Sequence, residues 1–391
     1  MKVTKSFGEA EDFSGKIIIY GASVYGELAY RGLERMGFKP DYFCDRASAG
    51  KQKFDIDIIH PDELDNFTND SIIIASADYF WEIKEYLDSI GHNRYYDMEI
   101  LLQQDFDREK LSPRAIEMLD NPDIYIKTVN NPQAEDKVHI VHMGLTVTEA
   151  CTLKCKDCSF LMQYYQHPCN IDLEKYKYCF DRFLEVVDYI TEVRPIGGEP
   201  FVNPDMYKVL EWYYNNSKIG SLDVYTNGTI VPNERTMEAL KLPKVKVHIS
   251  DYGAVNSERL DKLIDAFEKE KINYNIRKYD VWQVGGDLRC RNFTENQKRE
   301  VFSKCFMTNC YSFIKDRFYG CARAAHGINM GATPDFAADY VDFSNDNISN
   351  EELKRQLISL TKHRDYLETC NYCDGFDNHV AGVKPAVQIE K

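Results

Sequence analysis

The sequence lacks several features that would place the protein in a membrane, outside the cell or on a polyanion. It has no apolar run near the roughly 18 residues that a membrane-spanning helix needs, so no membrane partner is expected. Its first residues carry no apolar segment typical of a secretory signal, which predicts a cytoplasmic protein. Lys and Arg number 48 against 63 Asp and Glu, and the net charge of −15 argues against nucleic acid as a partner.

Cysteine, by contrast, is abundant, with 12 residues in a chain of 391. A chain of this length is expected to form two or three domains, and without a signal segment it is not a small secreted disulfide scaffold. Clustered cysteines in such a chain indicate metal ligands or redox groups. Two groups stand out, namely Cys151, Cys155 and Cys158, and then Cys305, Cys310, Cys321, Cys370 and Cys373.

The first hundred residues alternate between apolar, strand-like runs and helical segments. Residues 16–20 and 72–75 are short apolar runs typical of buried parallel strands, and a helical segment follows each. This alternation predicts an α/β fold class, with an N-terminal Rossmann-like, doubly wound domain over residues 1–110.

The turn after the first strand is similar to the glycine-rich fingerprint of dinucleotide-binding domains. Gly21 and Gly26 frame the turn, and Asp45 stands where a ribose-binding carboxylate is expected. Ser23 replaces the second glycine and hinders close approach of a pyrophosphate. Residues 14–104 resemble the Rossmann-like modules appended to bacterial polysaccharide and sugar-tailoring enzymes. The resemblance implies either a nucleotide or nucleotide-sugar site at the two glycines and Asp45, or a module used for packing and docking.

The remainder of the chain divides into three parts by the same reasoning. Residues 111–137 are charged and contain three prolines, so a linker with at most one helix, and no part of a core, is expected there. Strands and helices alternate again over residues 138–290, which predicts a parallel barrel or partial barrel with its chemistry at the carboxyl ends of the strands. Residues 291–391 contain the second cysteine group and are expected to form a small cysteine-rich domain.

The first cysteine group follows the first strand of the predicted barrel directly. Three thiolates at Cys151, Cys155 and Cys158 can hold one face of an iron–sulfur cube and leave the fourth iron without a protein ligand. An open metal position is what catalysis requires, because a substrate or cofactor can then coordinate there. A structural zinc site is the alternative, with His167 or Cys169 as its fourth ligand.

The Cys-x-x-x-Cys-x-x-Cys spacing after a first strand resembles the signature of the radical S-adenosylmethionine (SAM) superfamily. Later segments match the superfamily's motifs in order. The glycine-rich segment that closes the second strand resembles the motif that receives the methionine amino group, and polar turns close the third and fourth strands. These residues are Gly197, Gly198, Glu199 and Pro200, then Thr226 and Asn227, then Ser250. The resemblance covers about residues 139–290 and implies a partial (β/α)6 barrel.

The resemblance also implies a cofactor and a reaction. A reduced [4Fe–4S] cluster chelates SAM through its open iron, and one electron from a flavodoxin- or ferredoxin-type reductant cleaves the sulfonium. The 5′-deoxyadenosyl radical so formed abstracts hydrogen from an unactivated carbon. Many members place an aromatic residue before the third cysteine, where this chain has Asp157. The adenine contact is therefore assigned to Phe160, with Tyr164 and Tyr165 as alternatives.

The second cysteine group resembles the auxiliary-cluster domains of the same superfamily. Residues 316–321 are similar to the hairpin that introduces a cysteine in SPASM and twitch domains. Five cysteines are too few for two clusters, so the resemblance implies one auxiliary [4Fe–4S] cluster in a shortened, twitch-like domain. The preferred ligands are Cys305, Cys321, Cys370 and Cys373, with Cys310 as the alternative to one of them. A structural zinc ion is again the competing interpretation.

Three functions are consistent with these patterns. The first is a radical SAM enzyme acting on a carbohydrate, polyol or nucleotide-linked sugar, and the second is a maturase of a peptide or protein. The third is a non-catalytic iron–sulfur or zinc scaffold, which the glycine-rich methionine motif disfavours. Oxidation of the substrate is the expected outcome, because an auxiliary cluster can accept an electron. Epimerisation is the alternative, with the thiol of Cys290 or Cys169 returning a hydrogen atom.

Overall fold

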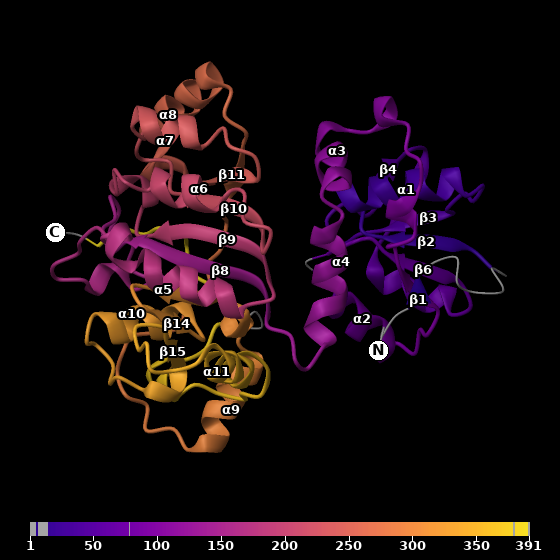
Figure 1. Cartoon of the computed structure of the whole chain (residues 1–391). Helices are drawn as coiled ribbons and strands as arrows, with labels where there is room; N and C mark the ends of the chain where they lie inside the picture. The colour runs from indigo at the N-terminus through magenta and orange to yellow at the C-terminus, as the bar shows by residue number, and fades with distance from the viewer. Residues whose placement is uncertain (1–4, 7–14, 78, 378–379, 390–391) are drawn as a thin grey trace. The chain divides into compact units, whose positions relative to one another are not determined.

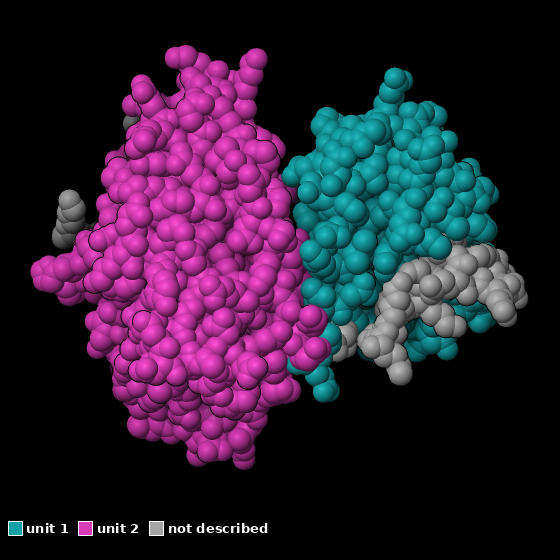
Figure 2. Space-filling model, viewed as in Figure 1, with its two compact units in different colours: residues 1–135 teal, residues 136–391 magenta. Residues whose placement is uncertain are grey.

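The structure is a computed structural model that describes residues 5–6, 15–77, 79–377 and 380–389. The chain forms two compact units, residues 1–135 and residues 136–391 (Figure 1 and Figure 2). Each unit has its own hydrophobic core and its own sheet. Within the described residues, no helix combines the length and the apolarity needed to cross a membrane.

The first unit is built on a seven-stranded sheet with the order β1-β7-β6-β2-β3-β5-β4. Its neighbouring strands are parallel except for the β4–β5 pair. The strands are β1 (Lys5–Ser6), β2 (Ile17–Tyr20), β3 (Tyr42–Cys44), β4 (Gln52–Lys53), β5 (Ile56–Ile59), β6 (Ser71–Ile74) and β7 (Tyr95–Asp97). Helices α1 (Val24–Arg35) and α2 (Phe80–Ser89) follow β2 and β6. The predicted doubly wound α/β unit is confirmed, because β2 lies between β3 and β6 at the point where the strand order reverses.

The prediction of a linker over residues 111–137 is wrong for residues 113–130, because these residues form two helices of the first unit. Helices α3 (Pro113–Asp120) and α4 (Asp123–Asn130) place Met118 and Tyr125 in the core of that unit. The Tyr125 hydroxyl donates a hydrogen bond of 2.8 Å to the Ile74 carbonyl. Pro113 occupies the first turn of α3, where a helix tolerates proline because that N–H has no intrahelical partner.

The second unit is built on an eight-stranded sheet with the order β12-β11-β10-β9-β8-β13-β14-β15. Strands β12 to β13 of this order are parallel, and β14 and β15 extend the sheet antiparallel. The strands are β8 (His139–Thr148), β9 (Tyr189–Gly197), β10 (Ile219–Thr226), β11 (Val245–Asp251), β12 (Tyr274–Lys278), β13 (Tyr311–Ile314), β14 (Arg317–Tyr319) and β15 (Tyr340–Asp342). Helices follow β8, β9, β10 and β11, namely α5 (Leu173–Val186), α6 (Tyr207–Tyr213), α7 (Glu234–Ala239) and α8 (Ser257–Glu270). The predicted alternation of parallel strands and helices is confirmed.

The cysteine-rich C-terminal part belongs to the same compact unit as the barrel strands, which differs from the separate domain predicted from residue 291. It contains α9 (Glu295–Lys304), α10 (Ala322–Asn329) and α11 (Asn350–Lys362). Strand β13 pairs with β8, and the Phe183 ring of α5 stacks on Phe318 of β14 at 5.0 Å. Main-chain pairing and a shared aromatic core therefore join the two parts, and sequence spacing did not reveal either contact.

Candidate functional site

A cavity lies where strands β8 to β11 of the second unit end, and its water-accessible volume is about 420 Å³. Its wall combines the three-cysteine loop, the carboxyl ends of the strands and the segment that leads into β13. It includes ten residues singled out from the sequence, namely Cys151, Cys155, Cys158, Phe160, Gly197, Gly198, Thr226, Asn227, Ser250 and Cys310. The fold thus brings together residues that lie up to 159 positions apart in the chain, from Cys151 to Cys310.

The cysteine loop is held by contacts from distant segments. The Asn227 side-chain amide lies 3.5 Å from the Cys151 sulfur, and the Gln388 amide donates to the Cys155 sulfur at 3.3 Å. Gln388 also accepts a hydrogen bond of 2.8 Å from the Lys154 N–H. Amide donors to sulfur stabilise negative charge on a thiolate. Nothing in the local sequence of Gln388 links it to a loop 233 residues away, so its role is visible only in the fold.

The three thiol groups are buried, and burial favours their protonated form. It raises the pKa of Cys151 to about 12 and that of Cys155 to about 11, and it also raises the pKa of Cys158. Binding of a metal by these thiols must therefore release protons. Among the described residues, no group of His, Cys, Asp or Glu has the geometry to hold a single metal ion. The donor set of three thiols on a wall without carboxylates fits a thiolate-bound iron–sulfur cluster.

The two glycines of the methionine motif allow two strand ends to pack closely. A Cβ atom on Gly197 would lie 2.0 Å from the Thr148 carbonyl oxygen, and one on Gly198 would lie 2.1 Å from that of Ala150. Glu199 N–H also donates to the Ala150 carbonyl at 2.9 Å. Glycine is therefore required at both positions, and the motif presents main-chain groups rather than side chains to the cavity.

Glu199 is the one charged residue of the motif that resembles the methionine amino-group site, but its side chain does not face the cavity. Its side chain is 0% exposed, and neither Glu199 nor Pro200 lines the cavity. The carboxylate accepts hydrogen bonds from the Thr226 hydroxyl and the Asn227 N–H, both at 2.7 Å. Glu199 is therefore a positioning residue that holds the turn after β10, and the cavity wall in that place is made by Thr226 and Asn227 themselves.

Replacing Glu199 by Gln should remove a pH dependence from the stability of the metal-free chain. Burial raises the pKa of Glu199 to about 7 from its ordinary value of 4.5, so the folded chain holds this proton longer than the unfolded chain. The contribution of the group to stability therefore falls as the pH rises through this interval. Between about pH 5 and about pH 8, the wild-type chain should lose roughly 3 kcal/mol relative to Glu199→Gln in denaturant unfolding.

Glu149→Gln is the matched control for this measurement. Burial raises the pKa of Glu149, but hydrogen bonds from Asn329 and Cys169 outweigh it and leave the pKa below its usual value. Its contribution to stability is therefore complete above the unfolded pKa and is lost only as the pH falls below it. The difference between wild type and Glu149→Gln should stay nearly constant over the same interval. The same constancy for Glu199→Gln would contradict the prediction.

Of the aromatic residues considered for the adenine contact, only Phe160 lines the cavity. The Tyr164 side chain is 37% exposed, and the Tyr165 hydroxyl is hydrogen-bonded to the His326 ring at 2.8 Å. Asn256 is a positioning residue that the sequence did not reveal. Its side-chain amide donates to the carbonyls of Asn227 and Ser250, so it joins two neighbouring strand ends of the cavity.

Arg194 of β9 and Tyr225 of β10 also line the cavity, and no motif in the sequence pointed to them. Arg194 donates two hydrogen bonds to Glu192, at 2.7 and 2.9 Å, and its guanidinium lies 5.0 Å from the centre of the Tyr225 ring. The Tyr225 hydroxyl donates to the same carboxylate at 3.0 Å. The signal in the sequence was that Glu192 and Arg194 alternate with apolar residues along a buried strand. Residues i and i+2 of a strand lie on the same face, so both side chains were expected on one face of the sheet.

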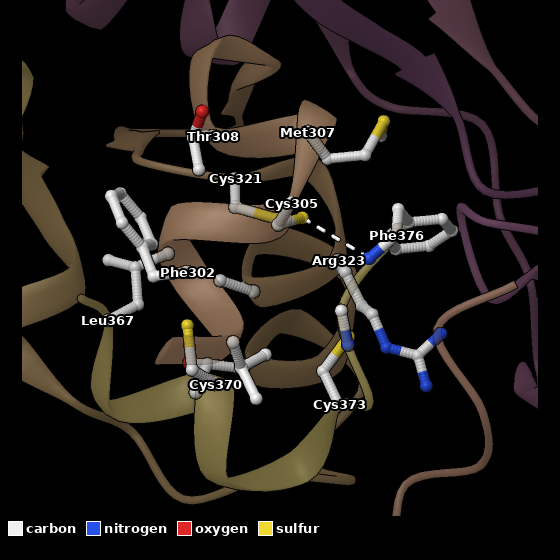
Figure 3. Close-up of a pocket in the computed structure, with 14 residues that line it drawn as sticks. Phe302, Cys305, Met307, Thr308, Cys321, Arg323, Leu367, Cys370, Cys373 and Phe376 are labelled. Carbon is white, nitrogen blue, oxygen red and sulfur yellow. Dashed lines mark hydrogen bonds between the residues drawn. The ribbon is translucent and has the colours of Figure 1, made fainter. Parts of the chain in front are cut away.

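Four cysteines line a second, smaller cavity of about 30 Å³ of water-accessible volume (Figure 3). Cys305 ends α9, Cys321 precedes α10, and Cys370 and Cys373 lie in and after a short helical turn (Glu368–Tyr372). Main-chain N–H groups approach the sulfurs of two of them, with Phe376 at 3.4 Å from Cys305 and Gly375 at 3.3 Å from Cys373. These four are the preferred ligands from the sequence.

Burial also raises the pKa of three thiols of the smaller cavity. It raises the pKa of Cys305 and of Cys370, and it raises that of Cys373 to about 11. Arg323, only 3% exposed, lines this cavity and lowers the pKa of Cys305, Cys373 and Cys158 against the effect of burial. Four thiols around one cavity, with a buried cation beside them, fit a fully protein-ligated cluster of net negative charge.

The other three candidate cysteines, Cys310, Cys169 and Cys290, lie outside the smaller cavity. Cys310 lines the larger cavity and not the smaller one. Cys169 is exposed and its thiol donates to Glu149 at 3.2 Å, while Cys290 is exposed and accepts from the Asn371 amide at 3.2 Å. Neither lines the larger cavity, so the structure gives no support to either as a thiol facing the substrate.

In the first unit, the glycine-rich turn is explained by packing. Gly21 has a φ of +116°, and a Cβ on it would lie 2.5 Å from the Ala75 carbonyl oxygen. A Cβ on Gly26 would lie 2.1 Å from the Gly21 carbonyl oxygen. The Asp45 carboxylate accepts hydrogen bonds from the N–H groups of Ala22, Ala47 and Ser48. Nucleotide binding at Gly21, Gly26 and Asp45 stays a prediction.

Asp45→Ala should destabilise the first unit whether or not a nucleotide binds there. The substitution leaves three main-chain N–H groups without their acceptor, and we expect a loss of roughly 1–3 kcal/mol. Thermal unfolding with and without a nucleotide-linked sugar separates the two interpretations. If Asp45 also binds a ribose, the variant loses the ligand-induced stabilisation that the wild type shows. An equal ligand-induced stabilisation in both would assign the turn to packing alone.

Comparison with known proteins finds no family model and no curated protein that matches this chain. The similar solved structures include a hexahistidine-tagged anSMEcpe with bound AdoMet, at 21% identity over 35% of this chain and 43% of that chain, with a TM-score of 0.29. They also include Streptococcus suis SuiB bound to S-adenosylmethionine, at 17% identity, coverage of 52% and 45%, and a TM-score of 0.29. A third is BtrN in complex with AdoMet and 2-DOIA, at 11% identity, coverage of 60% and 92%, and a TM-score of 0.34. The matched region spans less than half the length of the first two proteins.

Proposed function

We propose that this chain is a radical SAM enzyme that abstracts hydrogen from a carbohydrate, polyol or nucleotide-linked sugar. The observation that carries the proposal is the larger cavity, where the three-cysteine loop meets the glycine motif and the polar strand ends. These motifs follow one another along the chain in the order that resembles the superfamily. Their residues also lie around one cavity, which supports the same assignment.

Cys151, Cys155 and Cys158 would hold a [4Fe–4S] cluster, and the position without a protein ligand would be left to SAM. When bound, this pair supplies a carbon radical able to abstract hydrogen from an unactivated C–H bond. The residues of the chain orient and shield the reactants. Asn227 and Gln388 direct amides at the cysteine sulfurs, and the main chain at Gly197 and Gly198 offers polar groups to the cofactor.

The cavity wall supports a neutral, hydroxylated substrate. The positive charge of Arg194 is balanced by Glu192, so this wall combines donors and acceptors without a net charge. Ser312, which is 0% exposed, places a hydroxyl on the same cavity. A surface of this kind pairs with hydroxyl groups, each of which donates and accepts.

The C-terminal segment contributes to exclusion of water from the site. Trp282 lines the cavity and exchanges two main-chain hydrogen bonds with Val383, at 2.9 and 2.8 Å. Its ring packs edge-on against Tyr252 at 5.5 Å. The segment then continues to Gln388 at the cysteine loop, so one stretch of chain contacts both Trp282 and Cys155 of the cavity wall. Shielding of this kind protects a reactive radical from side reactions.

The proposal is tested by anaerobic incubation of the reconstituted protein with SAM, a one-electron reductant and a panel of possible substrates. The panel contains polyols, nucleotide-linked sugars and unrelated peptides, and 5′-deoxyadenosine is quantified for each. We expect a sugar-type substrate to stimulate 5′-deoxyadenosine formation in the wild type and not in Cys155→Ala. If only peptides stimulated 5′-deoxyadenosine formation, the proposed substrate class would be wrong and the protein would be a peptide maturase. No 5′-deoxyadenosine above the Cys155→Ala background with any substrate would contradict the radical SAM assignment.

A further inference from the structure

The larger cavity contains a thiol that the two cysteine groups do not use. Cys310 lines this cavity, whereas the four cysteines of the smaller cavity surround their own space without it. Its sulfur lies 3.6 Å from Nε2 of His142 on β8. Burial lowers the pKa of His142 to about 3, so the ring is neutral. Burial also raises the pKa of Cys310 to about 12, although the charge of Arg194 acts in the opposite direction, so the thiol keeps its proton.

The main chain holds Cys310 in a defined place. Its N–H donates to the Met307 carbonyl at 3.0 Å, and its carbonyl accepts from the Ala322 N–H at 2.9 Å. The next residue begins β13 and pairs with Met143, five positions before the end of β8. The cysteine loop follows the end of that strand. Cys310 therefore lies deeper in the barrel than the cofactor residues, with the cavity between them.

Ser312 gives a second, independent sign that this part of the wall meets a ligand. It is two residues after Cys310 on β13 and lines the same cavity. Its side chain is 0% exposed, and its hydroxyl oxygen has no hydrogen-bond partner within the described structure. A buried hydroxyl without a partner costs free energy, and a substrate hydroxyl bound in the cavity would satisfy it.

We propose that Cys310 is a catalytic residue that donates a hydrogen atom to the substrate radical, while Ser312 binds a substrate hydroxyl beside it. This inference rests on the proposed function and adds the fate of the substrate radical. A carbon between the cofactor residues and Cys310 loses hydrogen on one face and receives it on the other. The enzyme is therefore an epimerase. The outcome differs from the oxidation expected from the sequence, since Cys310, unlike Cys169 and Cys290, lies on the cavity wall.

The step balances in atoms and electrons. The S–H bond of Cys310 breaks homolytically and a C–H bond forms at the substrate radical, which leaves a sulfur radical on Cys310. One electron from a reductant of the flavodoxin or ferredoxin class and one proton from water restore the thiol. The substrate and its product are isomers, so the carbon undergoes no net oxidation.

The first test needs no turnover. Cys310→Ala and Cys310→Ser should keep the full iron and sulfide content of the reconstituted wild type, together with its electron paramagnetic resonance spectrum. Cys169→Ala, which alters an exposed thiol off the cavity, is the matched control. Loss of iron from both Cys310 variants, with full iron in the control, would make Cys310 a cluster ligand and overturn the proposal.

The second test is turnover in deuterium oxide with the substrate that best stimulates 5′-deoxyadenosine formation. We expect an isomeric product with one solvent deuterium from the wild type and from Cys169→Ala. Cys310→Ala and Cys310→Ser should still form 5′-deoxyadenosine but no deuterated isomer, because neither side chain has an S–H bond. Ser312→Ala should raise KM more than it lowers kcat. A wild-type product lighter by two hydrogen atoms would overturn the Cys310 role and leave the proposed function standing, whereas absence of 5′-deoxyadenosine would contradict both.

Discussion

Replacing Cys151, Cys155 and Cys158 together by Ala should remove about half of the iron and sulfide and abolish cleavage of SAM. Two [4Fe–4S] clusters contain about eight irons per chain, and this loop would hold four of them. Among the described residues, the cavity wall has one other cysteine, Cys310, which lies directly before β13 rather than in the loop. Iron and sulfide analysis after anaerobic reconstitution, with a SAM cleavage assay, measures both effects.

The triple variant should keep its fold, because the loop contributes three thiols to a cavity rather than to the main core. Circular dichroism of the metal-free proteins provides that comparison. Cys44→Ala is the matched control, since Cys44 is fully buried on β3 of the first unit and contacts no cavity of the second. Unchanged iron in the triple variant, or one zinc ion per chain in its place, would refute the assignment of a cluster to this loop.

Replacing Cys370 and Cys373 by Ala should remove the other half of the iron and leave SAM binding in place. Both sulfurs line the smaller cavity, and loss of two of four ligands leaves its cluster without adequate coordination. The larger cavity contains neither residue, so its cofactor site should persist. Iron analysis combined with equilibrium binding of SAM to the reconstituted variant separates the two sites.

Cys310→Ala is the control for this second experiment, because it removes a nearby cysteine that belongs to the other cavity. It should keep about eight irons, whereas the double variant keeps about four. Equal iron losses in the control and in the double variant would show that Cys310 shares the auxiliary cluster. If the double variant retained all of its iron, Cys370 and Cys373 would not be ligands of the second cluster.

Much of the candidate site could be predicted because its signals are local. Cys151, Cys155 and Cys158 lie within eight residues, so their spacing alone restricts where the three sulfurs can be. The glycine motif and the polar turns follow apolar strands, and parallel strands bring their carboxyl ends to one edge of a sheet. The same reasoning predicted both parallel sheets from their apolar runs.

The failures share a cause, which is that each depended on a partner distant in the chain. Prolines suggested a linker over residues 111–137, but Met118 and Tyr125 bury apolar surface against the first unit. Glu199 appeared available for a ligand, but its carboxylate accepts hydrogen bonds from the turn after β10. Gln388 carried no signal, since its partner Cys155 is reached only by the folded C-terminal segment.

The sequence by itself determined the ligand chemistry, the two cysteine groups and the order of strands and helices, because residue type and short-range spacing decide these. Only the tertiary structure decided which cysteine belongs to which cavity. A gap of 48 residues separates Cys321 from Cys370, and a flexible chain of that length allows many arrangements of the sulfurs. Packing of α9, α10 and the helical turn at Glu368–Tyr372 selects one of them, which encloses four thiols in one cavity. Pairing of β13 with β8 holds Cys310 on the wall of the other.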